Sequence, residues 1–128
     1  MGHIMAEVYK DQIYRPYLPL QKEGTLALDI GGNIGLVSLY LSHYFDRVIT
    51  LEPSFEHFDA LNRNLQVNKV DNVKPIKKAL FIKEGTLPFG GPKDNRTMRS
   101  LHMATWTSGK HEEMVDCVTI DKLFEDEG

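Results

Sequence analysis

The chain has 128 residues, enough for one domain with a modest hydrophobic core. Its composition is ordinary for a globular protein, with 41% hydrophobic and 26% charged residues. The net charge is −3 and no long run of one sign occurs, which argues against a general nucleic-acid or membrane-surface binder, because such proteins need a basic face. No stretch is apolar over the roughly 18 residues that a membrane span requires.

The cysteine and histidine content predicts no metal site. Cys117 is the single cysteine, so it can form neither an internal disulfide nor a thiolate metal centre, and a reducing, cytoplasmic setting is expected. The histidines lack the spacing of a helical metal motif. Residues 1–5, MGHIM, look like the remnant of an expression vector, which leaves residues 6–128 as a single domain.

Strands and helices alternate along the first half of the chain. Residues 6–24 predict a short helix and an irregular lead-in, and the apolar residues 25–30 predict a strand buried on both faces. Apolar residues at helical spacing follow from Ile34. Residues 47–52 predict a second strand, which Pro53 ends, and Ser54 is a suitable N-cap for an amphipathic helix over residues 54–68.

The second half of the chain gives a weaker pattern. Residues 73–81 predict a third strand, placed at a sheet edge because Pro75 cannot donate to a ladder. Residues 83–113 are rich in Gly, Pro, Ser and Thr and predict loops with a short hairpin. A last strand is expected over 114–120 and the start of a helix over 121–128. The β-α-β-α-β order predicts an α/β fold with a Rossmann-like, doubly wound parallel sheet.

The stretch DIGGNIG lies where the first strand passes into a helix, the place where open α/β sheets bind ligands. Gly31 can adopt backbone angles that other residues avoid, and Gly35 permits tight contact between the helix and the strand. A dinucleotide prefers G-x-G-x-x-G, which this spacing does not match, and Asp29 directly before the turn would repel a phosphate. S-adenosylmethionine carries an ammonium and a sulfonium group, so the acid favours it.

Glu52 ends the second predicted strand, where an acid accepts hydrogen bonds from both ribose hydroxyls of a nucleotide cofactor. That acid suits NAD as well as S-adenosylmethionine. The combination of strand, D-x-G-x-x-x-G turn, helix, strand and terminal acid predicts a nucleotide-type cofactor. The acid at Asp29 and the glycine spacing favour S-adenosylmethionine, with an NAD-binding Rossmann fragment as an alternative.

At these residues the chain resembles class I S-adenosylmethionine-dependent methyltransferases, and most of all the FkbM-type family. The segments that carry the resemblance are LDIGGNIGLVSLYLS, ITLEPSFEHFDALNRNLQVN, NVKPIKKAL and VTIDKLFED. The resemblance covers residues 24–128, loosely over 84–114, and implies methyl transfer, commonly to an oxygen of a small molecule or sugar.

The resemblance also implies positions for the cofactor. The turn residues and Asp29 would face its methionine part, Glu52 would hold the ribose, and the adenine would lie between the start of the second helix and the end of the third strand. Phe55 falls in this region, but it also fits the apolar stripe of its helix, and we expect it to pack in the core. The implied cofactor-binding residues are Asp29, Gly31, Gly32, Asn33, Gly35, Glu52, Pro53, Ser54, Lys78 and Ala79.

The chain departs from the family at its end. In the family the Thr-Leu-Asp segment leads into a fourth strand that ends in Asp-x-Glu-Gly, and this chain ends at Gly128, before that strand. We therefore expect the cofactor-binding half of a methyltransferase, truncated after the third parallel strand plus one extra strand or hairpin. The strand over 25–30 would then keep an open apolar edge, which predicts a homodimer or a swapped assembly.

The sequence identifies no catalytic base. Four residues of the long loop could reach the site, although solvated loop residues are the simpler interpretation: Asp94, His102, Trp106 and His111. Phe89 could line an acceptor pocket or simply pack. Three functions therefore compete: a methyltransferase, a non-catalytic cofactor-binding module that needs a partner chain, and an NAD-dependent oxidoreductase fragment.

Overall fold

The computed structural model describes residues 14–92, 100–101 and 110–128, with side chains described for 14–90 and 113–128. The expected vector remnant lies outside these residues. So do Asp94, His102 and Trp106, and of His111 only the backbone is described. The first described element is a short 3-10 helix, η2 (Arg15–Tyr17), which begins the irregular lead-in expected there.

A parallel sheet with its crossover helices confirms the predicted α/β fold. The sheet order is β1-β2-β3, with β1 spanning Leu26–Ile30, β2 Arg47–Leu51 and β3 Val73–Ile76. Both strand pairs are parallel. Helix α2 (Leu36–Ser42) connects β1 to β2, and α3 (Phe55–Val67) connects β2 to β3.

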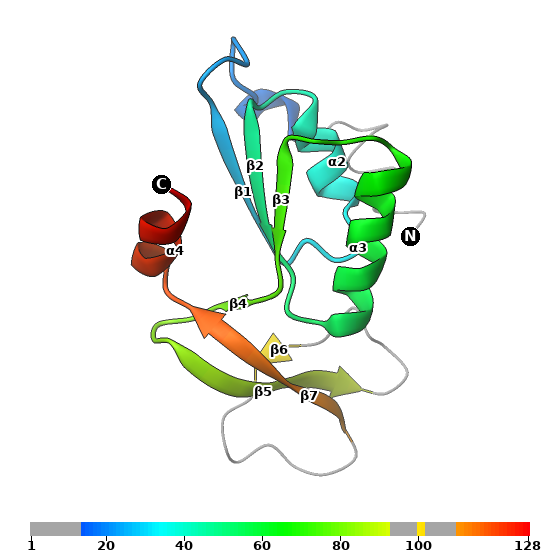
Figure 1. The fold of residues 1–128 in the computed structure, drawn as a ribbon, viewed down its shortest axis with the longest axis vertical. Coiled ribbons are helices and arrows are strands. Elements are labelled where there is room, and N and C mark those ends of the chain that lie inside the picture. Colours follow the sequence, from blue (N-terminus) through cyan, green and yellow to red (C-terminus); the bar gives the residue numbers. More distant parts are fainter. Residues whose placement is uncertain (1–13, 93–99, 102–109) are drawn as a thin grey trace.

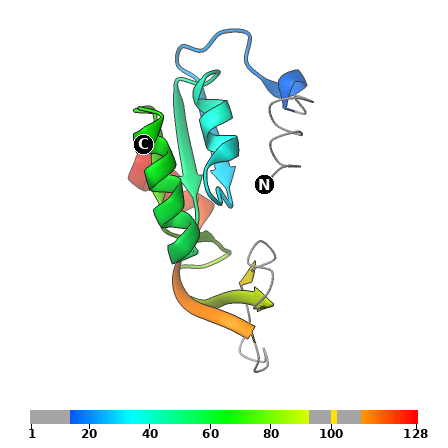
Figure 2. The same ribbon diagram turned by 90° about the vertical axis from the view of Figure 1, so that its right-hand side faces the viewer.

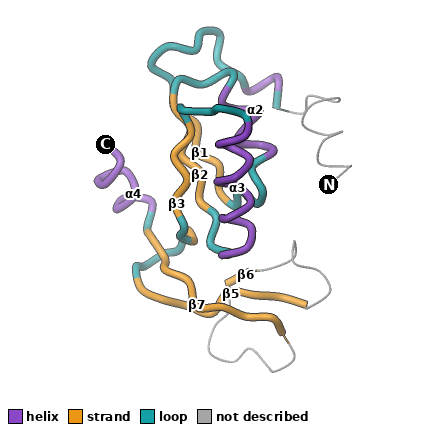
Figure 3. Tube along the Cα trace, turned by 45° about the vertical axis from the view of Figure 1, so that its right-hand side comes forward, coloured by secondary structure: helices purple, strands orange, loops and turns teal. Residues whose placement is uncertain are grey.

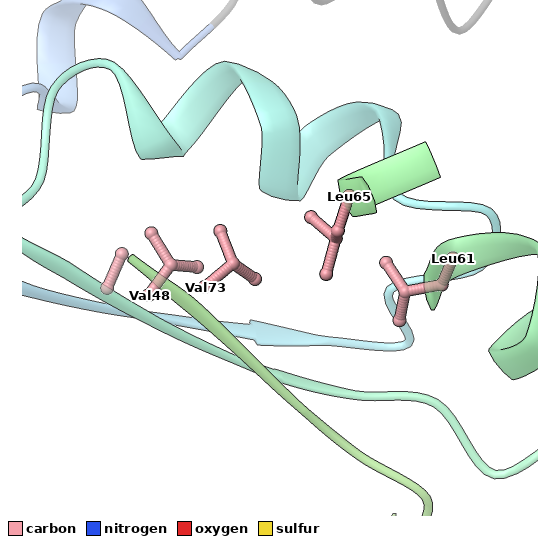
Figure 4. Packing of buried hydrophobic residues seen from close by; sticks show 5 residues of the cluster. Val48, Leu61, Leu65 and Val73 are labelled. Carbon is pink, nitrogen blue, oxygen red and sulfur yellow. The ribbon is translucent and has the colours of Figure 1, made fainter. Parts of the chain in front are cut away.

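Helices cover both faces of this sheet, as a doubly wound arrangement requires. Helices α2 and α3 lie on one side and α4 (Ile120–Glu127) lies on the other (Figure 1). On the first side Val48 and Val73 of the sheet pack against Leu61 and Leu65 of α3 (Figure 4). On the second side Leu123 of α4 completes a separate buried cluster with three strand residues, which are Ile49, Leu51 and Val118.

The two edges of the parallel sheet differ. Within the described residues β1 pairs only with β2, so its other edge is open, as the sequence predicted. Leu26 and Ile30 of β1 are 42% and 47% exposed. The opposite edge is β3, which confirms the placement of Pro75. The edge at β1 therefore combines unpaired backbone groups with exposed apolar side chains.

The predicted third strand over 73–81 is wrong in its length, because the structure divides it. The carbonyl of Ile76 accepts the amide of Glu52 at 3.1 Å and the amide of Lys78 at 3.0 Å. The second of these bonds closes a tight turn that takes the chain out of the parallel sheet. The residues that follow form β4 (Ala79–Leu80), which belongs to a second sheet.

That second sheet corrects the expectation of loops with a short hairpin over 83–113. Its order is β4-β7-β5-β6, where β5 is Gly85–Pro92, β6 Ser100–Leu101 and β7 Lys110–Val118. Strand β5 pairs with β7 along its whole length, and β7 begins four residues before the strand expected over 114–120. Side chains that alternate along the two strands share one buried cluster, which explains the pairing: Leu87, Phe89, Val115 and Cys117.

The second sheet lies at the carboxyl end of β1, β2 and β3 (Figures 2 and 3). The strands of the parallel sheet therefore end on the side of the molecule where the second sheet lies. As for membrane insertion, the helices in the described ranges are all too short or too polar to cross a bilayer.

Candidate functional site

The glycine-rich turn after β1 is fastened to the neighbouring strand through its own amides. The amides of Gly31 and Gly32 both donate to the carbonyl of Leu51, at 2.8 and 2.9 Å, and the amide of Gly35 donates to the carbonyl of Gly32 at 2.9 Å. The amide of Asn33 donates to Glu52 Oε1 at 2.8 Å. The turn is thus closed by bonds within the protein, and these four amides are occupied.

Two glycines of the turn are required by space. A Cβ at Gly32 would lie 2.1 Å from Oγ1 of Thr50. A Cβ at Gly35 would lie 2.6 Å from Cδ1 of Leu61, and Gly35 also has a φ of +98°. The sequence predicted tight contact between the helix and the strand at Gly35, whereas the close contact there is with Leu61 of α3. By contrast, Gly31 has a φ of +77° and open space where its Cβ would stand.

Asp29 lies beneath the turn and is only 9% exposed. Its Oδ2 accepts the hydroxyl of Ser38 of α2 at 2.6 Å. Thr50 stands opposite Asp29 on β2, and its buried hydroxyl lies beside the Asp29 carboxylate. Burial raises the pKa of Asp29, while the hydroxyls of Ser38 and Thr50 counteract part of that rise. Ionised Asp29 places a negative charge directly under the glycine turn.

Glu52 joins three elements at the carboxyl end of β2. It is 4% exposed, and while Oε1 accepts from the turn, Oε2 accepts the amide of Ser54 at 2.7 Å. A rigidly held carboxylate of this kind suits the two adjacent hydroxyls of a ribose.

Helix α3 supports the turn from behind. Asn64 donates from Nδ2 to the carbonyl of Ile34 at 2.7 Å, one residue before Gly35. Leu61, on the same face of α3, fills the space that the missing side chain of Gly35 leaves. The turn is therefore held by β2 on one side and by α3 on the other.

Phe55 does not pack in the core, which corrects the expectation from its helical stripe. Its side chain is 65% exposed at the first residue of α3, beyond the edge of the parallel sheet that buries Leu61. Lys77 Nζ lies 5.7 Å from the centre of the Phe55 ring. The amide of Phe55 donates to both carboxylate oxygens of Glu113 on β7, at 3.0 and 3.3 Å.

The remaining residues implied by the resemblance lie on either side of this point. Pro53 and Ser54 are buried between β2 and α3. Ser54 is the N-cap of α3, as the sequence predicted, although its side chain makes no capping hydrogen bond. Lys78 is half-buried after the turn at Ile76, whereas Ala79 belongs to β4 and pairs with Cys117.

A pocket of about 250 Å³ lies on the second sheet, and none of its lining residues comes from the glycine turn. Phe81, Leu87 and Cys117 form part of its lining. Burial raises the pKa of the Cys117 thiol, and Asp116 adds to the rise, so this cysteine is not an activated nucleophile. Within the described residues, no group of His, Cys, Asp and Glu side chains could hold a metal ion.

The structure thus brings the turn residues, Asp29, Glu52 and Ser54 together at one end of the sheet. It adds residues that the sequence analysis did not select. Ser38 could have been selected from the helical spacing, because it lies on the face of its helix that turns towards Asp29. Thr50 becomes visible only from the register of β1 and β2. Glu113 gave no signal, since it meets Phe55 across 58 residues of chain.

Part of this chain is similar in sequence to a curated methyltransferase. The chain is 34% identical over 89 residues to Methyltransferase sdnD of Sordaria araneosa, an alignment that covers 66% of this chain and 33% of that protein. The chain thus spans about a third of the length of this curated relative. No family model matches the chain.

Among solved structures, a SAM-dependent methyltransferase from Aquifex aeolicus aligns with a TM-score of 0.49 and 19% identity, over 58% of this chain and 40% of that one. A protein from Streptococcus mutans in complex with SAH aligns with a TM-score of 0.48 and 15% identity, over 56% of this chain and 40% of that one.

Proposed function

We propose that this chain is the cofactor-binding part of an S-adenosylmethionine-dependent methyltransferase. The observation that carries the proposal is that amides of the glycine turn donate hydrogen bonds within the protein. A pyrophosphate-binding turn offers its N–H groups to the ligand. Here the amides of Gly31 and Gly32 bind Leu51, and the amide of Asn33 binds Glu52. These three amides are therefore already bonded within the protein and are not offered to a dinucleotide.

The charges at the site favour a cationic ligand that carries a ribose. Asp29 lies under the turn and Glu52 lies beside it, both buried and both acidic. A phosphate would be repelled by this pair, whereas the ammonium and sulfonium groups of S-adenosylmethionine are attracted to it. Open space at Gly31 leaves room for the ligand to approach the backbone. The residues present thus fit S-adenosylmethionine better than NAD.

The chemistry follows from the bound cofactor, whose sulfonium supplies an activated methyl group for a nucleophilic atom of the acceptor. The chain's own residues bind and orient: Glu52 holds the ribose, and the turn with Asp29 fixes the methionine end. Alignment of the acceptor with the sulfonium accounts for most of what such an enzyme must provide. A general base is needed only where the acceptor must lose a proton.

The finer assignment rests on sequence resemblance. We propose an FkbM-type enzyme of the cytoplasm that methylates an oxygen of a small molecule or sugar. The segments DIGGNIG and TIDKLF support the FkbM-type assignment, and the similarity to Methyltransferase sdnD supports methyl transfer. A non-catalytic module that acts with a partner chain is the second candidate, favoured by the open edge of β1.

Titration calorimetry with two ligands tests the proposal. S-adenosylhomocysteine, the product form of the cofactor, should bind with one site per chain, and NAD under the same conditions should give no heat. The variant Glu52→Ala should bind S-adenosylhomocysteine about tenfold or more weakly, while Glu56→Ala, a matched and exposed change on the first turn of α3, should keep wild-type affinity. Binding of NAD with no heat from S-adenosylhomocysteine would overturn the proposal.

A further inference from the structure

We propose that the pocket on the second sheet is a separate binding site for a small apolar molecule that carries both an ammonium and a carboxylate group, such as a free aliphatic amino acid. The pocket measures about 250 Å³ and shares no lining residue with the glycine turn. The function proposed above assigns this pocket no role, and the inference does not depend on that function.

The pocket lies where three strands of the second sheet meet, at the end of β7 from which α4 continues (Figure 1). Cys117 of β7 pairs there with Ala79 of β4 on one side and with Gly85 of β5 on the other. Gly85 lines the pocket without a side chain, and open space surrounds the position that its Cβ would take. A ligand can therefore approach the backbone at this glycine.

The interior of the pocket is apolar. Phe81, Leu87 and Cys117 line it and belong to one hydrophobic cluster. Burial raises the pKa of the Cys117 thiol, which stays neutral near pH 7 and acts as part of the apolar lining. One water occupies about 30 Å³ in the liquid, so 250 Å³ has room for about eight units of that size. This volume fits a short branched aliphatic chain with one polar end.

Two opposite charges line the exposed side of the pocket. Lys83 and Glu84 are adjacent and exposed, and neither forms a hydrogen bond or an ion pair within the described residues. The charge of Glu84 acts on Lys122 of α4. The ion pairs of Lys122, however, are with Asp126 at 3.0 Å and with Glu125 at 3.8 Å, both on its own helix. Both charges at the pocket therefore stand ready for a ligand.

A zwitterion matches these charges better than an ion of one sign. A simple carboxylate would be attracted to Lys83 and repelled by Glu84, and a simple amine would meet the reverse. A molecule with both groups can pair its carboxylate with Lys83 and its ammonium with Glu84 while its apolar chain enters the pocket. Because exposed ion pairs contribute little, the apolar chain supplies most of the affinity and the charges supply the selectivity.

An NMR titration with three probes of equal chain length tests the assignment. Leucine carries both charges, isocaproate lacks the ammonium group and isopentylamine lacks the carboxylate. Leucine should bind with a dissociation constant of about a millimolar, as expected for so small a ligand, and should shift the amides of Gly85, Leu87 and Cys117. Each of the other probes should bind about two- to fivefold more weakly, the scale of one exposed ion pair.

Two variants assign the charges. Lys83→Met should bind leucine no more tightly than isopentylamine, and Glu84→Gln should bind leucine no more tightly than isocaproate. The chain offers a matched control in Lys22 and Glu23, a second exposed Lys-Glu pair that lies before β1 and outside the pocket. Lys22→Met and Glu23→Gln should each keep the wild-type preference for leucine over both other probes.

Equal binding of the three probes, or no saturable shift with leucine, overturns the inference and leaves the proposed function intact. Saturation with S-adenosylhomocysteine should leave the affinity for leucine unchanged, because the two sites share no residue. Competition between the two ligands would show that the pocket is not a separate site and would also overturn the inference. Absence of S-adenosylhomocysteine binding, with leucine still bound, overturns the proposed function alone.

Discussion

The amide of Asn33 and the carboxylate of Glu52 are joined by a 2.8 Å hydrogen bond across 19 residues of sequence. This bond connects the glycine turn to the end of the neighbouring strand. The same carboxylate accepts from Ser54 at the start of α3. The acid that would hold a ribose therefore also fixes the two segments that would surround it.

We expect Glu52→Ala to weaken binding of S-adenosylhomocysteine about tenfold or more, because a hydrogen bond to a charged group contributes roughly 1.5–3 kcal/mol. Titration calorimetry measures the change, and circular dichroism confirms that the variant is folded. Unaltered affinity in a folded Glu52→Ala protein would show that the ribose does not lie on this acid.

Asp29→Asn should separate stability from binding. The pKa of Asp29 is raised in the folded chain, mainly by burial, so the folded state holds its proton up to a higher pH than the unfolded state. Stability from this group is complete below the unfolded pKa and falls as the pH rises through the folded one. Each unit of the shift costs the folded state about 1.4 kcal/mol at neutral pH.

The asparagine carries no charge, can accept from Ser38 and can donate to the buried Thr50 hydroxyl. We expect Asp29→Asn to raise the free energy of unfolding in urea at neutral pH. Affinity for S-adenosylhomocysteine should fall in the variant. Wild-type binding should weaken at low pH, where Asp29 takes up a proton, and this weakening should be smaller in the variant. A variant that is less stable yet binds as well as the wild type would contradict this role for Asp29.

Two glycines of the turn should respond differently to alanine. Gly31→Ala meets only the backbone cost of a positive φ, about 1–2 kcal/mol. Gly35→Ala adds a clash with the buried side chain of Leu61, which costs a further 1–3 kcal/mol or so. In thermal unfolding the Gly35→Ala variant should therefore have a lower transition temperature than the Gly31→Ala variant. Equal transition temperatures would argue against the tight packing of α3 on the turn.

The open edge of β1 should support self-association. Leu26 and Ile30 are exposed beside an edge of β1 that pairs with no strand in the described part of the chain, and we propose that a second copy pairs there. Light scattering at micromolar concentration should report a dimer for the wild type and a monomer for Leu26→Lys. The control Ile82→Lys, at an exposed apolar residue outside this edge, should stay dimeric. A monomeric wild type would rule out the pairing.

The sequence predicted those elements whose signals are local. The apolar run over 25–30 and the stripe of α3 specify a strand and a helix without reference to the rest of the chain. The break after Ile76 comes from the tight turn that the amide of Lys78 closes on the carbonyl of Ile76, and the apolar pattern of residues 73–81 does not show it. The long pairing of β5 with β7 was missed because glycine and proline in β5 suppress strand propensity. Alternation of Leu87 and Phe89 was the remaining clue.

The residues of the candidate site also divide into those with a local sequence signal and those without one. Asp29 and Glu52 were selected from the sequence because each lies at the carboxyl end of a strand beside a turn, a position that the topology makes significant. Phe55 was misplaced because the stripe of α3 continues past the edge of the sheet that buries it. Glu113 depends on how the second sheet docks at the start of α3, which only the folded chain shows.

The central claim, that the glycine turn and Glu52 form the binding site for S-adenosylmethionine, is tested most directly by an NMR titration with S-adenosylhomocysteine that resolves single amides. The account predicts saturable shifts at the amides of Gly31, Asn33 and Ser54. Saturable shifts confined to residues that line the separate pocket, such as Thr86 and Leu87, would contradict it. A spectrum that does not change would contradict it as well.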